Sequence, residues 1–355
     1  MMQASSSLPA LRALRLGELL DQAIRLYRRN FLTFIGIIAV VYVPLMILQT
    51  ISSTWLSSSL LNASPARTPE EIFLNSDSLI GLFSTVVLGF LQIILVQGIA
   101  TGALTRAVAD NYLGRKTNIL DAYRGIGKSW VSLLGALLLL GLVFIVAVLW
   151  WVIIPCIGWI TGLGMIAFLL TVVNPMVAPI VVLEGKGAVD AIRRAWSLTR
   201  RRFWPVLGYV FVLNLFSLLV VNGPVAIVNA ILPQFLGSFE DPSMRLVILS
   251  IIQMLVMLTA LLIYYPLQMT AFTLIYFDLR VRTEGFDLAL LTMNESELAD
   301  TSQAMAAPLS QPNERLMTGT DLGNFAILTL LAAGVYILFF TFIAGGAFFL
   351  SSLIR

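Results

Sequence analysis

The chain has 355 residues, of which 59% are hydrophobic and only 12% are charged, whereas about a quarter of the residues of a soluble domain are charged. This balance excludes a water-soluble protein, because no soluble core of this size buries so much apolar surface. Histidine is absent and Cys156 is the single cysteine, which removes the commonest general base, thiolate metal clusters and internal disulfides. We therefore expect no metal and no cofactor.

The first predicted element is an amphipathic helix over Leu16–Phe31. Its polar face carries Glu18, Gln22, Arg25 and Arg29. Apolar residues recur at helical spacing on the other side: Leu16, Leu20, Ala23, Ile24, Tyr27 and Phe31. A basic helix of this kind is expected to lie in the membrane interface, with its apolar face toward the acyl chains.

Seven segments are predicted to cross a membrane, because each exceeds the roughly 20 apolar residues that a span needs. None has a charged residue in its interior. Spans three and four meet at Pro155-Cys156, which predicts a tight hairpin. At Asn174-Pro175 and Asn222-Gly223-Pro224 one reading is a broken helix whose freed backbone groups bind a substrate; the alternative, which we favour, is hydrogen bonding of the polar side chains to neighbouring helices. The seven segments are Phe31–Leu56, Leu79–Leu104, Trp130–Ile154, Ile157–Leu183, Phe203–Leu232, Leu246–Phe277 and Phe325–Ile354.

The basic residues alternate strongly between successive connections. The N-terminal segment and the connections after spans two, four and six carry 19 of the 22 Lys and Arg residues, whereas the other connections carry only Arg67 and Arg245. Basic loops stay in the cytoplasm. The N-terminus is therefore predicted in the cytoplasm and the C-terminus outside.

An internal repeat relates two basic segments at an offset of 172 residues. Six residues of the first copy recur in the second, and a fainter third copy lies at Asn118–Trp130. Each copy precedes a pair of spans. The fold is predicted as an all-α polytopic bundle of three basic interfacial helices, each followed by a transmembrane hairpin, with an extra C-terminal transmembrane helix. The recurring residues are Ala23, Leu26, Arg28, Arg29, Phe31 and Gly36, matched by Ala195, Leu198, Arg200, Arg201, Phe203 and Gly208.

Three regions are predicted along the chain. Residues 1–292 form the six-span membrane domain. Residues 293–324 are rich in Ser, Ala, Pro, Asn and acidic residues and have the composition of a flexible cytoplasmic linker. Residues 325–355 form the last transmembrane helix, which is expected to be separable from the domain.

The candidate binding site is a set of arginines on two of the basic helices. In the second helix, Val189, Ile192, Trp196 and Phe203 are predicted to oppose the charged residues. The arginines are candidates for anionic headgroups or an acidic partner, each contributing about 1 kcal/mol near an anionic surface; alternatively they only anchor the topology. They are Arg25, Arg28, Arg29, Arg193, Arg194, Arg200, Arg201 and Arg202.

A second set of charged residues is predicted to form ion pairs that tie the basic face together. Most of it follows span six. Pairing with arginines of the other repeats is the structural alternative to a catalytic carboxylate pair, and without histidine or a metal set we favour pairing. The residues are Asp21, Asp121, Asp190, Asp278, Arg280, Arg282 and Glu284.

Three motifs resemble a prokaryotic family. They are Leu16–Phe31, Val182–Trp204 and Tyr276–Leu288, and they resemble, in this order, the glycerophosphoryl diester phosphodiesterase membrane domain. The resemblance covers roughly residues 10–292 and implies a six-span domain of the prokaryotic cytoplasmic membrane. The phosphodiesterase activity of that family belongs to a separate barrel with catalytic histidines, so it is not expected here.

Two classes of function remain from the sequence. The first is a non-catalytic scaffold or accessory subunit whose partners are membrane lipids and other membrane proteins. The second is a permease or lipid-handling protein with a cavity at the Pro-containing helices. Enzyme motifs such as HExxH and Walker A are absent from the sequence. Nucleic acid is not expected as a partner, because the basic segments directly adjoin membrane spans.

Overall fold

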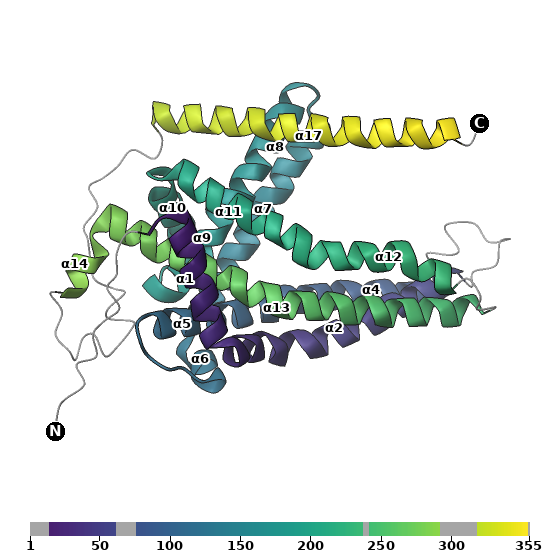
Figure 1. Cartoon of the computed structure of the whole chain (residues 1–355), viewed down its shortest axis with the longest axis horizontal. Helices are drawn as coiled ribbons and strands as arrows, with labels where there is room; N and C mark the ends of the chain where they lie inside the picture. Colours follow the sequence, from purple (N-terminus) through teal and green to yellow (C-terminus); the bar gives the residue numbers. More distant parts are fainter. Residues whose placement is uncertain (1–13, 62–75, 237–240, 292–317, 354–355) are drawn as a thin grey trace.

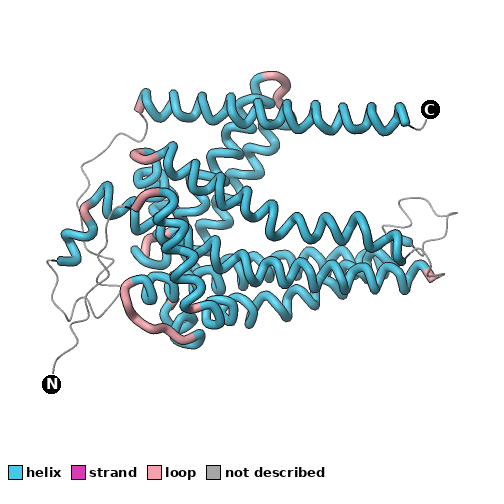
Figure 2. Tube along the Cα trace, viewed as in Figure 1, coloured by secondary structure: helices cyan, strands magenta, loops and turns pink. Residues whose placement is uncertain are grey.

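The computed structural model describes residues 14–61, 76–236, 241–291 and 318–353. Within these ranges the chain is helical and contains no strand (Figure 2). Seven helices are long and apolar enough to cross a membrane. The prediction of an all-α polytopic bundle is confirmed, and the chain is a multi-pass membrane protein.

The helices follow one another as three units, each with a short helix before a hairpin. The first unit consists of α1 (Leu16–Arg29), α2 (Phe31–Leu61), α4 (Ser76–Gln92), η1 (Ile93–Ala100) and α5 (Thr101–Tyr112). The second consists of α6 (Ile119–Gly125), α7 (Ser129–Ile153), α8 (Ile157–Phe168), η2 (Leu169–Val173) and α9 (Asn174–Glu184). The third consists of α10 (Ala188–Arg200), α11 (Phe203–Ser217), η3 (Leu218–Asn222), α12 (Gly223–Leu236) and α13 (Pro242–Glu284). Two further helices follow, α14 (Phe286–Leu291) and α17 (Gly319–Leu353) (Figure 1).

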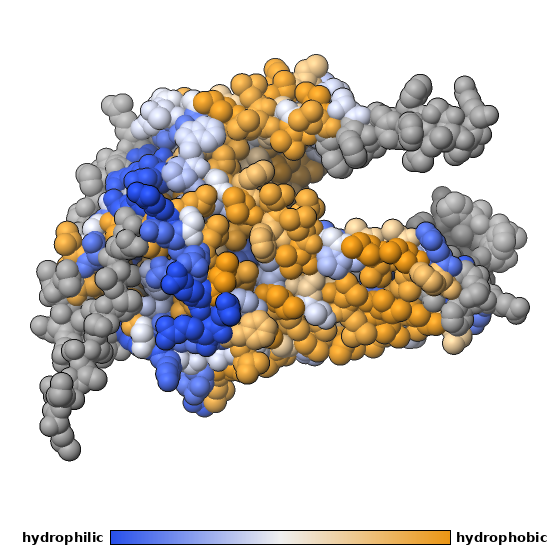
Figure 3. Space-filling model, viewed as in Figure 1, coloured by the Kyte–Doolittle hydropathy of each residue, from blue (hydrophilic) through white to orange (hydrophobic). Residues whose placement is uncertain are grey.

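Hydrophilic side chains gather at one end of the molecule, over α1 and its neighbours, while apolar side chains cover the long helices (Figure 3). We call this hydrophilic end the basic end, because Arg28, Arg29, Arg193 and Arg202 are exposed there. Lipid can solvate the apolar remainder, so exposed leucine and phenylalanine side chains are expected on its surface.

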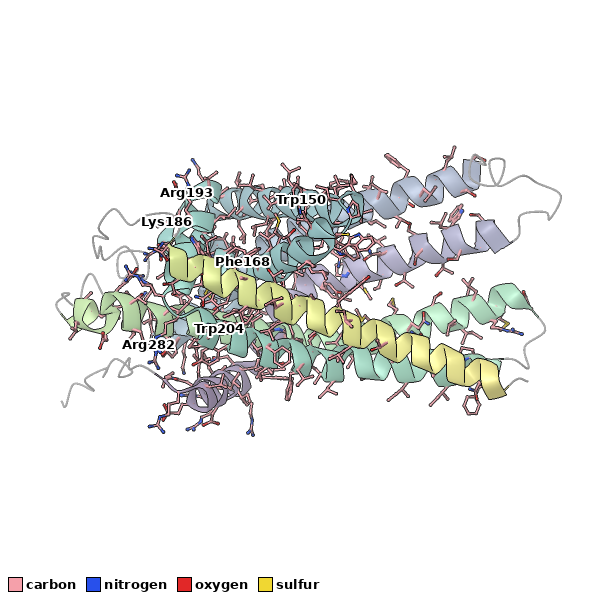
Figure 4. The ribbon with its side chains drawn as sticks, turned by 90° about the horizontal axis from the view of Figure 1, so that it is seen from above. Trp150, Phe168, Lys186, Arg193, Trp204 and Arg282 are labelled. Atoms are coloured by element: carbon pink, nitrogen blue, oxygen red, sulfur yellow. The ribbon has the colours of Figure 1, made fainter. Side chains whose placement is uncertain are left out.

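The packed core lies at the basic end. Nearly every residue of α5 and most residues of α9 are buried, whereas only three glycines of α8 are. Farther along, α2 pairs with α4 and α12 pairs with α13, and the two pairs diverge (Figure 4). The molecule is therefore tightly packed over one half of its length and open over the other.

Three spans contain a π-helical segment: η1, η2 and η3. The backbone stays helical through Asn174-Pro175 and Asn222-Gly223-Pro224, so neither site breaks its helix. Instead, the π-helical turn η2 ends directly before Asn174, and η3 ends at Asn222. Proline has no N–H to donate, and a π-helical turn accommodates the disturbed hydrogen-bond ladder without ending the helix.

The hairpin between α7 and α8 is as tight as predicted. Cys156 adopts a φ of 61° and a ψ of −74°, the conformation of a γ-turn, which reverses the chain. The Ile157 N–H donates to the Pro155 carbonyl at 2.8 Å. The two helices pack closely because Gly162 has no side chain: a Cβ there would lie 2.6 Å from the Cβ of Trp151.

The last helix, α17, begins at Gly319 and not at residue 325 as predicted. It packs along α8 and the start of α11. A Cβ at Gly164 would lie 2.8 Å from the Cβ of Thr329, and Trp204 donates its indole N–H to Asn324 at 3.1 Å. Most of the predicted linker, residues 293–317, lies outside the described residues.

Candidate functional site

Helix α1 lies against α13, and its buried stripe coincides only in part with the predicted apolar face. Leu19, Ala23 and Tyr27 are buried, whereas Leu16 and Ile24 are exposed. The Tyr27 hydroxyl donates to the carbonyl of Ile263 in α13 at 2.8 Å, and burial raises the pKa of Tyr27 to about 12. One apolar stripe of the helix thus contacts protein, and the predicted lipid-facing side is limited to the exposed remainder.

The other face of α1 carries three arginines of the candidate binding site. Arg28 and Arg29 are exposed and form no hydrogen bond or ion pair within the described part of the chain. Arg25 pairs with Asp21 one turn earlier. That hydrogen bond lowers the pKa of the Asp21 carboxyl and raises the pKa of the Arg25 guanidinium.

Helix α10 buries small residues, which corrects its predicted orientation. Ala191, Ala195 and Leu198 are buried, while Val189 is exposed. The close approach that alanines allow brings α10 against α7 and α9. As a consequence, one of the two adjacent arginines, Arg194, points into the protein and the other does not.

Arg194 joins three helices. Its Nε lies 3.1 Å from Oε2 of Glu184, at the end of α9, and its terminal nitrogen contacts Glu284, at the end of α13. The side chains of Glu184 and Glu284 are 7% and 2% exposed. A charge pair that is buried this deeply is stable only when both partners and their hydrogen bonds are present.

Arg280 completes the cluster from the same helix as Glu284. Its Nε donates to Oε2 of Glu284 at 3.0 Å, and its terminal nitrogen reaches the Tyr276 hydroxyl at 3.2 Å. Tyr276 in turn donates to Glu184 at 3.0 Å, and the guanidinium lies 4.3 Å from the ring centroid of Phe286. Two arginines and two glutamates therefore balance in charge. We call Glu184, Arg194, Tyr276, Arg280 and Glu284 the buried charge cluster.

Asp278 and Arg282 form a second group of hydrogen bonds, which connects the end of α13 to Leu14 and so fixes the start of α1. Asp278 accepts the backbone N–H of Leu14 at 2.8 Å and a hydrogen bond from Arg282 Nε at 2.8 Å. Arg282 also donates to the Leu14 carbonyl at 2.6 Å. The sequence placed these residues beyond the end of span six at Phe277, but α13 continues without interruption to Glu284.

The remaining predicted ion-pair residues behave differently. Asp121 and Asp190 are exposed, and neither forms an ion pair within the described ranges. Asp21 pairs within its own helix and not with another repeat. Glu184, which sequence reasoning missed, is a central acceptor; its position in one of the three family-like motifs was the available signal.

The eight candidate arginines therefore divide into two groups. Arg194 belongs to the buried charge cluster, and Arg200 lies 3.8 Å from Asp321 of α17 with its side chain 11% exposed. Arg201 donates to the Thr283 carbonyl at 3.3 Å. Figure 4 shows Arg193 and Lys186 extending outward at the basic end. The outward group is Arg25, Arg28, Arg29, Arg193, Arg201 and Arg202.

One protein-family model matches most of the sequence. The model of the Domain of unknown function (DUF7847) matches residues 14–279. The chain belongs to the DUF7847 family. The DUF7847 match begins at Leu14, which Asp278 holds, and includes Asp278 itself, whereas α14 and α17 lie outside it. No curated protein and no solved structure matches the chain.

Proposed function

We propose that this DUF7847 protein is a non-catalytic component of the prokaryotic cytoplasmic membrane, which engages anionic lipids or partner proteins through its basic end. The observation that carries the proposal is the division of the arginines. Buried partners neutralise Arg194 and Arg280, while Arg28, Arg29, Arg193 and Arg202 point outward without an ion pair in the described structure. Positive charge at the ends of membrane helices attracts anionic headgroups.

The orientation of the chain follows from the same charges. Basic connections remain in the cytoplasm, so we propose that the basic end faces the cytoplasm. With Cys156 replaced by Ser, single cysteines near Arg67 and Glu240 should react with an impermeant maleimide added to intact cells. Cysteines near Lys116 and Lys186 should react only after the membrane is opened. Reaction at Lys186 in intact cells would reverse the topology.

A triple variant tests the lipid role. Arg28→Gln, Arg193→Gln and Arg202→Gln together should weaken the preference for anionic lipid by about 3 kcal/mol before ionic screening, at about 1 kcal/mol per arginine. The measurement is the relative association of spin-labelled phosphatidylglycerol and phosphatidylcholine with the full chain in reconstituted membranes. It should be made at low and at high salt.

The matched control replaces the same three arginines with lysine, which keeps the charge. The lysine variant should retain the preference for phosphatidylglycerol. If the glutamine variant also retains it, lipid attraction at these arginines is refuted. If the lysine variant loses it as fully as the glutamine variant, the guanidinium geometry and not the charge alone holds the phosphate of the headgroup.

The permease or lipid-handling reading has one supporting feature. A cavity of about 70 Å³ lies between η1, α9 and α13, and Gln97, Thr101, Asn174 and Tyr265 line it. Thr101 and Tyr265 hydrogen-bond each other at 2.6 Å. The cavity has room for a few water molecules but not for a solute of ligand size, so the scaffold reading remains the better supported one.

A further inference from the structure

A second, larger cavity opens at the basic end between α1 and the end of α5. Its volume is about 690 Å³, within the range of small-molecule binding sites. One wall is the polar face of α1, from Glu18 to Asn30, and the other is formed by Asn111 to Lys116. The two walls come from opposite ends of the first hairpin, so folding of the hairpin creates the cavity.

The end of α5 directs two cations into this cavity. Gly114 has a φ of 85°, and its N–H donates to the Asn111 carbonyl at 3.2 Å while the Arg115 N–H donates to Asp110 at 2.8 Å. This hydrogen-bond pattern ends a helix and turns the chain back across its last turn. Arg115 and Lys116 therefore line the wall opposite α1.

The charges around the cavity do not cancel. Four cations line it, Arg25, Arg29, Arg115 and Lys116, against two acids, Glu18 and Asp21. Both acids already have partners: Asp21 binds Arg25, and Glu18 accepts the backbone N–H of Arg15 at 3.0 Å. Arg29 and Lys116 form no hydrogen bond or ion pair with any described residue.

Gln22 also lies in the α1 wall. Its side chain hydrogen-bonds Tyr112 of the other wall, and its amide oxygen is fully buried, out of reach of a ligand in the cavity. Among the described residues, the groups left for a ligand are the cations Arg29 and Lys116, so the ligand needs an anionic group.

The cavity also lies at the depth of lipid headgroups. Arg29 is the last residue of α1, directly before span α2 begins at Phe31, and Tyr112 ends the second span. We propose that the cavity is a specific site for a phosphate ester, as in a phosphatidylglycerol headgroup or a free glycerol phosphate. This inference rests on the proposed anion-binding role of the basic end and assigns it a defined pocket.

The test compares two double variants of the full chain in mild detergent. Arg29→Gln with Lys116→Gln removes two cations that line the cavity, and Arg124→Gln with Lys128→Gln removes two exposed cations of the connection after α5 that do not. Binding of dihexanoyl phosphatidylglycerol and of glycerol 3-phosphate is measured by titration calorimetry. Dihexanoyl phosphatidylcholine serves as the neutral reference.

We expect saturable binding at one site per chain. The cavity variant should lose on the order of a hundredfold in affinity, about tenfold for each charge-assisted hydrogen bond, and the matched variant less than about threefold. Saturable glycerol 3-phosphate binding as strong as that of the lipid would support a soluble source, and binding of the lipid alone would support a headgroup.

Two results would contradict the proposal that this cavity binds a phosphate ester. Equal losses in the two double variants would mean diffuse surface attraction, which leaves the proposed function intact. Absence of saturable binding to either phosphate would also overturn it, whatever preference the spin-labelled lipids show. Equal thermal unfolding temperatures of the two variants would establish that any difference in binding is not a difference in folding.

Discussion

Replacing Arg194 with Met should lower the free energy of unfolding by about 3–5 kcal/mol, the range for removing one partner of a buried ion pair. The loss leaves Glu184 and Glu284, from which water is nearly excluded, with the Arg280 guanidinium and with the partly exposed amino group of Lys186, 3.9 Å from Glu184. Methionine fills much of the same space, so the missing charge and not a cavity accounts for the effect. Thermal or denaturant unfolding in mixed micelles measures it.

The chain supplies its own control for this prediction at the preceding residue. Arg193 lies on the same helix but is exposed and forms no ion pair within the described chain, so Arg193→Met should change stability by less than about 1 kcal/mol. Adding Glu284→Gln to Arg194→Met removes the uncompensated charge and should restore part of the loss. Similar destabilisation by Arg193→Met and Arg194→Met would contradict the arrangement of the buried charge cluster.

Replacing Gly164 with Leu should detach α17 from α8 along most of their contact. The glycine faces Thr329, and even a Cβ would lie 2.8 Å from the Cβ of Thr329, closer than packed carbon atoms approach. The remaining links lie at the start of α17, where Arg200 reaches Asp321 and Trp204 binds Asn324. We expect the bundle to remain folded, because the main core contains no residue of α17.

Spin labels on exposed Ile160 and Leu331 report this change as a distance distribution, with Cys156 replaced by Ser. The chain with Gly164 should give one narrow distribution of distances between the two labels, and the Gly164→Leu variant should give a broad one. Gly141→Leu is the control, since nothing lies within 4 Å of a Cβ at Gly141. A chain ending at Leu291 shows whether the bundle folds without α17. A narrow, unshifted distribution for Gly164→Leu would mean that the contact does not hold the helix.

The transmembrane spans were predictable because a helix that crosses a lipid bilayer needs about 20 consecutive apolar residues. Each one needs only enough uncharged residues in a row, and the repeat of basic segments marked where each hairpin begins. The start of α17 was placed too late because Asp321 interrupts the apolar pattern. In the structure Asp321 accepts hydrogen bonds from Thr318 and contacts Arg200, and so the helix continues through a charged residue.

The candidate site was less predictable, because sequence periodicity does not say what covers a helix face. The apolar pattern of α1 fits two adjacent stripes equally well, and only the position of α13 selects Leu19, Ala23 and Tyr27. Arg193 and Arg194 look alike in the sequence. Arg194 points into the protein and Arg193 is exposed because Arg194 binds Glu184 and Glu284. These two glutamates are distant along the chain and meet only when α9, α10 and α13 pack.

The one-sided position of the core bears on membranes of different thickness. Two spans have 35 and 41 residues, well beyond the roughly 20 that a bilayer requires. Hydrophobic mismatch is usually relieved by tilting helices, and here the diverging pairs α2–α4 and α12–α13 extend beyond the packed core and can tilt. The arginine-bearing end can therefore keep one shape in thin and thick bilayers, while the far halves of the spans adjust to the membrane.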